Sequence, residues 1–370
     1  MLEGEEELGE EVPAIPSERG WARWSEMVSS RGPVVRGMVG VWRVFRANPL
    51  TLVGFLLVIL LVVTAIIVQV LPTVSFALTH HTYSILPYDP YTLNPNAANL
   101  PPSPQHWLGT DNIGRDVFSR VLAALPLDLF IGIATTTLAL GIGTGLGLVA
   151  GFWDRPWSAG GGASAVIMRT TDVFLAFPPL ILVLVIASVL GFGLTAGLIA
   201  ILVTWWPYYV RLTRGEVLAV KHQLYVTAAR ASGVSEVRIL FRHIVRNLLE
   251  PLIVYWTLDI GTVIIIFSTI SFAGAGVQPP TPEWGSMINA YQQSSGIVSY
   301  PWLILGPGLA IFITVLAFSL LGDGMRDILD PRSRRILTQG TAVPTSTELV
   351  AASSAPITPA TGAPLVGGSE

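Results

Sequence analysis

Residues 50–71 read LTLVGFLLVILLVVTAIIVQVL, a run of 22 residues without a charged side chain. An α-helix needs about 20 apolar residues to cross the hydrocarbon core of a bilayer, so this run predicts a transmembrane helix. Across all 370 residues, 51% are hydrophobic and only 12% are charged, against about 25% charged in a soluble domain. Together with the mean hydropathy of +0.61, this composition indicates an integral membrane protein.

Apolar runs farther along the chain predict five more crossings. The run 173–210 is too long for one helix, and the Gly-Phe-Gly turn at 191–193 divides it. Pro178 and Pro179 are expected to bend the helix before this turn, and Pro307 the last helix. The sequence therefore predicts an all-α integral membrane protein with six transmembrane helices, at residues 50–71, 129–151, 168–190, 193–210, 251–273 and 300–322.

The basic residues are distributed unevenly between the connections. Of the 21 Lys and Arg residues, two (Arg115 and Arg120) lie in the connection 72–128 and none in 274–299. The other 19 lie in the two ends of the chain and in the connections on the same side of the membrane as those ends. Basic segments favour the cytoplasmic side of a membrane. Both termini are therefore predicted to be cytoplasmic, and the two poorly basic connections to lie outside.

The two ends of the chain differ in composition from its middle. Six glutamates occupy residues 3–11, and from about residue 338 the chain is rich in Thr, Ser, Ala, Pro and Gly, so both ends are predicted to be disordered. The outer connection is expected to carry a short interfacial helix capped by Asp116. The predicted organisation is a leader at 1–49, a first helix at 50–71, an outer connection at 72–128, a domain with five helices at 129–323 that includes a basic loop at 213–248, and a tail at 324–370.

Several kinds of functional site are excluded or weakly supported. The chain has no cysteine, and its five histidines lack metal-ligand spacing. It also lacks the G-x-x-x-x-G-K-[ST] loop that cradles phosphates. Asp259 is the one ionisable residue well inside a predicted helix, and we expect it to hydrogen-bond a neighbouring helix or line a wet cavity. A single carboxylate gives little support for an ion-driven carrier, so the energy for any transport is expected to come from another protein.

The predicted helix 129–151 contains regularly spaced glycines. Gly141 with Gly145, and Gly143 with Gly147, form small-xxx-small pairs, which allow another helix to approach closely.

The basic loop contains YVTAARASGVSEVRILFRHIVRN, residues 225–247. Gly233 is expected to end a first helix in a conformation of positive φ, and Ser235 to cap a second helix. An apolar stripe is predicted on that second helix, at Val237, Leu240, Phe241, Ile244 and Leu248. From the residues alone two readings stay open: a hairpin lying on the inner leaflet, with its arginines near anionic headgroups, or a docking element for a cytoplasmic protein.

The pattern Thr227-Ala228-Ala229-x-x-x-Gly233, followed by His243-Ile244 and Asn247, resembles the "EAA" loop of binding-protein-dependent ABC importer permeases. Thr227 stands where that family has Glu, and Val245-Arg246 where it has Leu-Pro. Further segments resemble the dipeptide/oligopeptide/nickel branch, the DppC/OppC-like subunits. These are RANPLTLVGF (46–55), LGTDNIGRDVFSRV (108–121), SFAGAGVQPPTPEWGSMI (271–288) and PWLILGPGLAIFITVLAFSLLGDGMRDILDPR (301–332).

The resemblance implies a type I ABC importer permease in a prokaryotic plasma (inner) membrane, without catalytic activity of its own. It implies a second homologous permease subunit, two ATPase subunits that bind ATP and Mg, an extracytoplasmic solute-binding protein and a peptide-like substrate, with no nucleic acid. The coupling helix around 225–236 would dock into the ATPase, with Val226 and Val234 as apolar contacts of the turn. The implied docking residues are Tyr225, Val226, Thr227, Ala228, Ala229, Gly233, Val234 and Ser235. The alternatives are a gradient-driven secondary transporter or channel, and a membrane scaffold without transport.

Overall fold

The computed structural model of the chain describes residues 49–79, 83–154, 159–295 and 300–329. The predicted disorder of both ends falls outside these residues. The regular elements within them are helices, apart from one β-bridge between Thr110 and Asp116. The all-α fold class is therefore confirmed.

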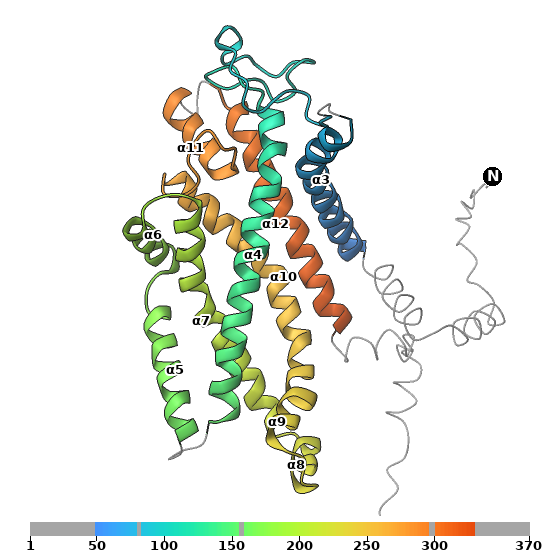
Figure 1. The fold of residues 1–370 in the computed structure, drawn as a ribbon, viewed down its shortest axis with the longest axis vertical. Helices are drawn as coiled ribbons and strands as arrows, with labels where there is room; N and C mark the ends of the chain where they lie inside the picture. The colour runs from blue at the N-terminus through green and yellow to red at the C-terminus, as the bar shows by residue number, and fades with distance from the viewer. Residues whose placement is uncertain (1–48, 80–82, 155–158, 296–299, 330–370) are drawn as a thin grey trace, which may run out of the picture. The chain divides into compact units, whose positions relative to one another are not determined.

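The helices follow one another along the chain as shown in Figure 1. They are α3 (Pro49–Thr79), η1 (Pro95–Ala97), α4 (Val117–Phe152), α5 (Ala159–Leu175), α6 (Pro179–Leu190), α7 (Leu194–Lys221), α8 (Leu224–Ala231), α9 (Glu236–Ile239), η2 (Leu240–Ile244), α10 (Val245–Phe272), α11 (Trp284–Ser295) and α12 (Trp302–Leu329). The short helices α8 and α9 lie at one end of the bundle, the hairpin end. Residues 83–116 and α11 lie at the opposite end, the cap end.

In the described residues, four helices are long and apolar enough to cross a membrane: α3, α4, α12 and the continuous helix Glu236–Phe272, which includes α10. The bent pair α5–α6 is a fifth candidate. The helix α7 has 28 residues, but Trp, Pro and Tyr side chains between 205 and 209 make its middle less apolar. The fold is thus a multi-pass membrane bundle with four to five apolar spans.

The predicted crossing 168–190 is not one straight helix. The segments Gly162–Leu175 and Pro179–Leu190 meet at 93°. Pro178 has an extended ψ of 124°, because the ring of the following Pro179 excludes the residue before it from the α conformation. The bend expected at these prolines is therefore confirmed, whereas Pro307 lies inside the continuous helix α12.

Other helix boundaries extend beyond the predicted crossings. Asp116 caps a helix as expected, since its carboxylate accepts a hydrogen bond from the Ser119 N–H at 2.8 Å. This helix is α4 itself, so the prediction of a separate interfacial helix is wrong. Residues 117–128 continue this helix because Val117, Ala124 and Leu125 are buried in an apolar cluster with residues of α11 and α12, which gives these turns a packed face.

A close contact joins α4 to α7 through glycines. A β-carbon at Gly143 would lie 2.6 Å from the Trp206 carbonyl oxygen, and one at Gly147 would lie 2.8 Å from the Val210 carbonyl oxygen. Gly141 and Gly145 face open space, with no atom within 4 Å of such a carbon. Only one of the two predicted small-xxx-small pairs therefore serves this contact.

Asp259 of α10 is held by α7, as expected for a carboxylate inside a bundle. Its Oδ2 accepts hydrogen bonds from the Trp205 indole at 2.8 Å and from the Tyr209 hydroxyl at 2.9 Å. A buried charge needs such partners. The predicted hydrogen bond to a neighbouring helix is therefore confirmed, and it ties α10 to α7.

Two buried carboxyl groups meet at the cap end. Glu283 precedes α11, and its oxygens accept hydrogen bonds from the N–H groups of Gly285 at 2.8 Å and Ser286 at 2.7 Å. Asp128 of α4 accepts one from the Trp284 N–H at 3.2 Å and shares a side-chain hydrogen bond with Glu283. Burial raises the pKa of Glu283. A hydrogen bond between two carboxyl groups requires a proton, so this contact joins α4 to α11 only while one is retained.

The glycine contact predicts a difference between neighbouring substitutions. Gly143→Ala should lower the free energy of unfolding by about 1–3 kcal/mol, because the added methyl group meets backbone that cannot rotate away. Gly145→Ala places its methyl group in open space and should leave stability unchanged or slightly higher. Thermal unfolding of both variants in the same detergent would check this. Equal losses of stability would contradict the assignment of the contact.

The paired carboxyl groups predict a pH dependence of stability. An acid whose folded-state pKa is raised contributes stability that is present below its unfolded-state pKa and is lost as the pH rises through the folded-state value. Asp128→Asn retains the acceptor for the Trp284 N–H and offers Glu283 an amide donor in place of a proton. The melting temperature of the variant should therefore fall less steeply above the ordinary glutamate range than that of the parent chain. Glu250→Gln, at an exposed site on α10, is the control and should follow the parent curve.

Candidate functional site: the hairpin of residues 224–248

The hairpin follows α7 almost directly. The Lys221 ammonium donates a hydrogen bond to the Gly151 carbonyl oxygen at 2.9 Å, which fixes the last turn of α7 to α4. After two residues α8 begins, and it ends before Gly233, whose φ is +77°. The Gly233 N–H donates to the Arg230 carbonyl at 3.1 Å, and the Val234 N–H to the Ala229 carbonyl at 3.1 Å. The glycine turn predicted from the sequence is confirmed.

The second half of the hairpin starts at Ser235. This residue has the extended backbone of an N-cap, but its side chain makes no capping hydrogen bond. Glu236 lies in the first turn of α9, as expected, and its carboxylate accepts two hydrogen bonds from the Arg230 guanidinium at 3.0 and 3.2 Å. A bidentate pair of this kind fixes an orientation as well as a distance. The two arms of the hairpin are thus joined on both sides of the turn.

Packing against the bundle supports the hairpin from inside. Val226 is fully buried and belongs to the same core cluster as Ile239, Ile244 and Leu248. Near the base, the Asn247 amide donates to the Tyr225 hydroxyl at 2.9 Å. These contacts make the hairpin a rigid extension of α7 and α10.

The structure places the predicted docking residues on different sides of this unit. Tyr225, Thr227, Ala228, Gly233 and Ser235 are exposed, and Ala229 and Val234 are half-buried against the core. Val226 was expected to contact a partner, and its side chain is enclosed by the chain itself. The Thr227 hydroxyl lies 3.4 Å from the Gln223 carbonyl oxygen of its own helix.

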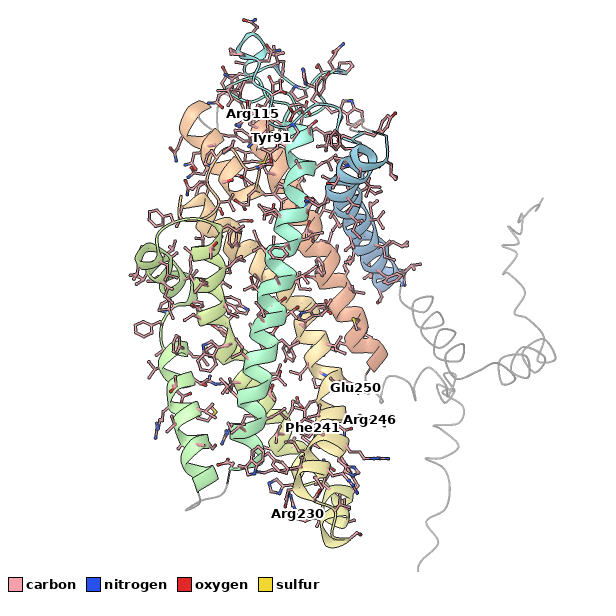
Figure 2. All side chains as sticks on the ribbon, viewed as in Figure 1. Tyr91, Arg115, Arg230, Phe241, Arg246 and Glu250 are labelled. Atoms are coloured by element: carbon pink, nitrogen blue, oxygen red, sulfur yellow. The ribbon has the colours of Figure 1, made fainter. Side chains whose placement is uncertain are left out.

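Other apolar residues of the hairpin are exposed and were not predicted as contacts. Leu224 is 87% exposed, Phe241 is 65% exposed, and Val237 is exposed with them; Figure 2 labels Phe241 near the hairpin end of the bundle. The sequence stripe had assigned Val237 and Phe241 to the same face as Leu240. In the structure Leu240 is buried while Val237 and Phe241 are exposed, and residues Leu240–Ile244 form a turn of π-helix.

Comparison with known proteins identifies related chains. The family described as "Binding-protein-dependent transport system inner membrane component" matches residues 143–335, and "N-terminal TM domain of oligopeptide transport permease C" matches residues 38–102. The chain is 41% identical over 299 residues to the glutathione transport system permease protein GsiD of Escherichia coli O6:K15:H31, covering 79% of this chain and 89% of that protein. It is 38% identical over 292 residues to GsiD of Pectobacterium atrosepticum, covering 79% and 90%. A chain of the inward-facing MetNI methionine ABC transporter aligns with a TM-score of 0.43 and 18% identity, covering 56% of this chain and 96% of that one.

The turn predicts a ranking of substitutions at Gly233. A β-carbon there would meet no atom within 4 Å, so the cost of a substitution is expected to come from the positive φ. Gly233→Val should cost about 1–2 kcal/mol and speed hydrogen exchange at the Val234 N–H. Gly233→Asn should cost less, because asparagine tolerates this region. Mass-spectrometric hydrogen exchange of peptides from the hairpin would compare them, and equal exchange in the two variants would contradict the prediction.

Proposed function

This chain belongs to the family of binding-protein-dependent transport system inner membrane components, and on that premise we propose that it forms half of the translocation pathway of an ABC importer. A second homologous permease completes the pathway. Two partner ATPase subunits bind and hydrolyse ATP with Mg, and an extracytoplasmic binding protein delivers the solute. The proposed solute is a di- or oligopeptide or a similar small solute, in keeping with relatives named as glutathione transport permeases.

The hairpin is the proposed contact with an ATPase subunit. The observation that supports this proposal is that an internally hydrogen-bonded turn holds the side chains of Leu224 and Phe241 exposed. Exposed apolar side chains that lie together can mark a site of protein–protein contact, and aromatic side chains such as Phe241 are enriched at protein interfaces. The turn itself adds a small surface, since Ala228 and Gly233 allow another backbone to come close.

The proposed topology has six crossings, with α7 as one of them. At 1.5 Å per residue its 28 residues span about 42 Å, which is enough for a bilayer. The hairpin end then faces the cytoplasm together with both termini, as the positive-inside rule requires for arginines such as Arg238, Arg242 and Arg246. The cap end, with residues 83–116 and α11, faces the binding protein.

The proposed mechanism is alternating access. ATP binding brings the two ATPase subunits together, and each hairpin follows its subunit as a rigid body. Because Lys221 ties the start of the hairpin to α4 at Gly151, this movement passes directly into the helices. The spans then close toward the cytoplasm and open toward the binding protein.

The docking proposal predicts which surface substitutions separate the subunits. Combined Leu224→Asp and Phe241→Asp should abolish co-purification with the ATPase subunits and ATP-dependent uptake, because a residue that dominates an interface contributes about 2 kcal/mol or more. Both residues are exposed in the chain, so the variant should keep its fold. Size-exclusion profiles and pull-down of the assembled complex would measure the result.

The matched control is the pair Arg238→Gln and Arg242→Gln, which changes exposed charge on the same segment. It should retain the ATPase subunits. If the aspartate variant keeps the ATPase subunits and its uptake while the arginine variant loses them, the exposed apolar residues do not form the contact and the docking proposal is wrong.

A further inference from the structure

The exposed face between α5 and α7 carries a group of charged and polar side chains, here called the polar seam: Arg169, Asp172, Tyr208 and Arg211. The Arg211 Nη2 lies 2.7 Å from the Asp172 Oδ1, and these side chains are 58% and 49% exposed. Tyr208 is 42% exposed and lies one turn before Arg211 on α7. Arg169 is exposed one turn before Asp172 on α5. Residues three apart share a helix face, so the seam runs along both helices.

The seam lies at bilayer depth. The glycine contacts set α7 beside α4, with Gly143 against Tyr209 and Gly147 against Thr213. Arg211 is therefore level with Gly145, inside the uncharged run 129–151 of α4. Gly145 precedes the end of that run by six residues, or about 9 Å of helix. Asp172 lies within the reach of one arginine side chain from this depth, because its carboxylate accepts a hydrogen bond from the Arg211 guanidinium.

An ion pair at this depth is unfavourable on a lipid-facing surface. Ionisable residues within membrane segments are rare, and almost all of them face the bundle interior or a water-filled cavity. The exposed side of α4 at the same level is apolar, for Ile142 is 46% exposed and Leu138 is also exposed. At one depth the bundle thus has an apolar face suited to lipid and a polar face that is not.

The charge of the seam selects a class of ligand. On the exposed face, two guanidinium groups lie near the single carboxylate of Asp172, which leaves an excess of one positive charge there. The other carboxylate near Tyr208, that of Asp259, is on the inner side of α7, where it is hydrogen-bonded by Trp205 and Tyr209. Asp172 engages Arg211 through one nitrogen, and a guanidinium has five N–H donors, so Arg211 can hold a second carboxylate beside the first. Tyr208 adds a hydroxyl on the same face.

We propose that the polar seam lines the solute passage and that Arg169 and Arg211 transiently bind the carboxylate of the solute as it passes. This inference rests on the proposed transport function and adds to it a requirement for an anionic group on the solute. Every linear peptide with a free C-terminus carries one. The competing arrangement, in which the second permease subunit covers the seam, becomes an outcome of the test.

The absence of cysteine from this chain makes thiol labelling a direct test. Tyr208→Cys and, as matched control at the same depth, Ile142→Cys would be placed singly in the assembled complex in membranes. Gly215→Cys is a second probe on the seam side of α7, where a β-carbon meets no atom within 4 Å, so it removes no packing. Labelling of this chain by a negatively charged and a positively charged methanethiosulfonate reagent would be followed by mass shift.

We expect the thiols of both seam variants to react on the order of tenfold faster than the control, as a charged, water-accessible cleft concentrates a soluble reagent. In the Tyr208→Cys variant the negative reagent should react faster than the positive one, and adding Arg169→Gln should reduce that preference. If the thiols of the Tyr208→Cys and Gly215→Cys variants are as unreactive as the control, lipid or the partner subunit covers the seam and the inference is wrong. Equal rates for the two reagents would overturn the carboxylate preference.

These readouts do not depend on transport. If the unsubstituted complex shows no ATP-dependent uptake, the proposed function fails whatever the labelling shows. If uptake is normal and the seam thiols are unreactive, only the inference fails.

Discussion

The rest of the structure depends on the close approach of α4 and α7. Gly143 and Gly147 leave no space for a side chain between the two backbones, so α7 has one position and one rotation relative to α4. From that position, side chains on its other faces contact α10, α5 and the end of α4. Tyr209 meets Asp259 of α10, Arg211 meets Asp172 of α5, and Lys221 returns to α4. A bundle that lacks a hydrophobic driving force between helices relies on contacts of this kind.

Much of the fold could be predicted from the sequence, because hydropathy measures the one constraint that a bilayer imposes on composition. The apolar runs located each long helix. Hydropathy does not measure how far a helix continues beyond the lipid, and so the start of α4 at Val117 and the end of α7 at Lys221 were missed. Hydropathy also does not predict the angle at which a helix bends where it is interrupted. Pro178 and Pro179 predict a bend, but its 93° depends on the helices against which α6 packs.

Features of the candidate site could likewise be predicted only in part from the sequence. Gly233 could be predicted, since a positive φ between two helices has a clear sequence signal. The inward direction of Val226 could not, because every apolar residue of a short helix is an equal candidate for contact until the supporting helices are known. The π-turn at Leu240–Ile244, within which Phe241 is exposed, leaves no signal in the apolar spacing. The pair Asp172–Arg211 was missed because each residue, read alone, lies near the edge of an apolar run.

The position of this ion pair connects the two proposed sites. The end of α7 is held in place by two contacts, so it cannot absorb a movement of the hairpin. Lys221 is hydrogen-bonded to Gly151 of α4, and Arg214 pairs at 2.9 Å with Asp154, just after the end of α4. The start of α5 is tied to α4 as well, since the Ser164 hydroxyl donates to the Ala150 carbonyl at 2.8 Å.

The far end of α5 stops at the 93° break, so it can pivot, and Asp172 lies there. A half-exposed ion pair contributes at most about 1 kcal/mol, which makes Asp172–Arg211 a weak contact between α7 and the part of α5 that can move. A hairpin displaced by its ATPase would open this contact first. The Arg211 guanidinium then needs another anion, and a solute carboxylate in the passage can take the place of Asp172. Coupling and solute binding would in this way share one helix, α7, with no relay between them.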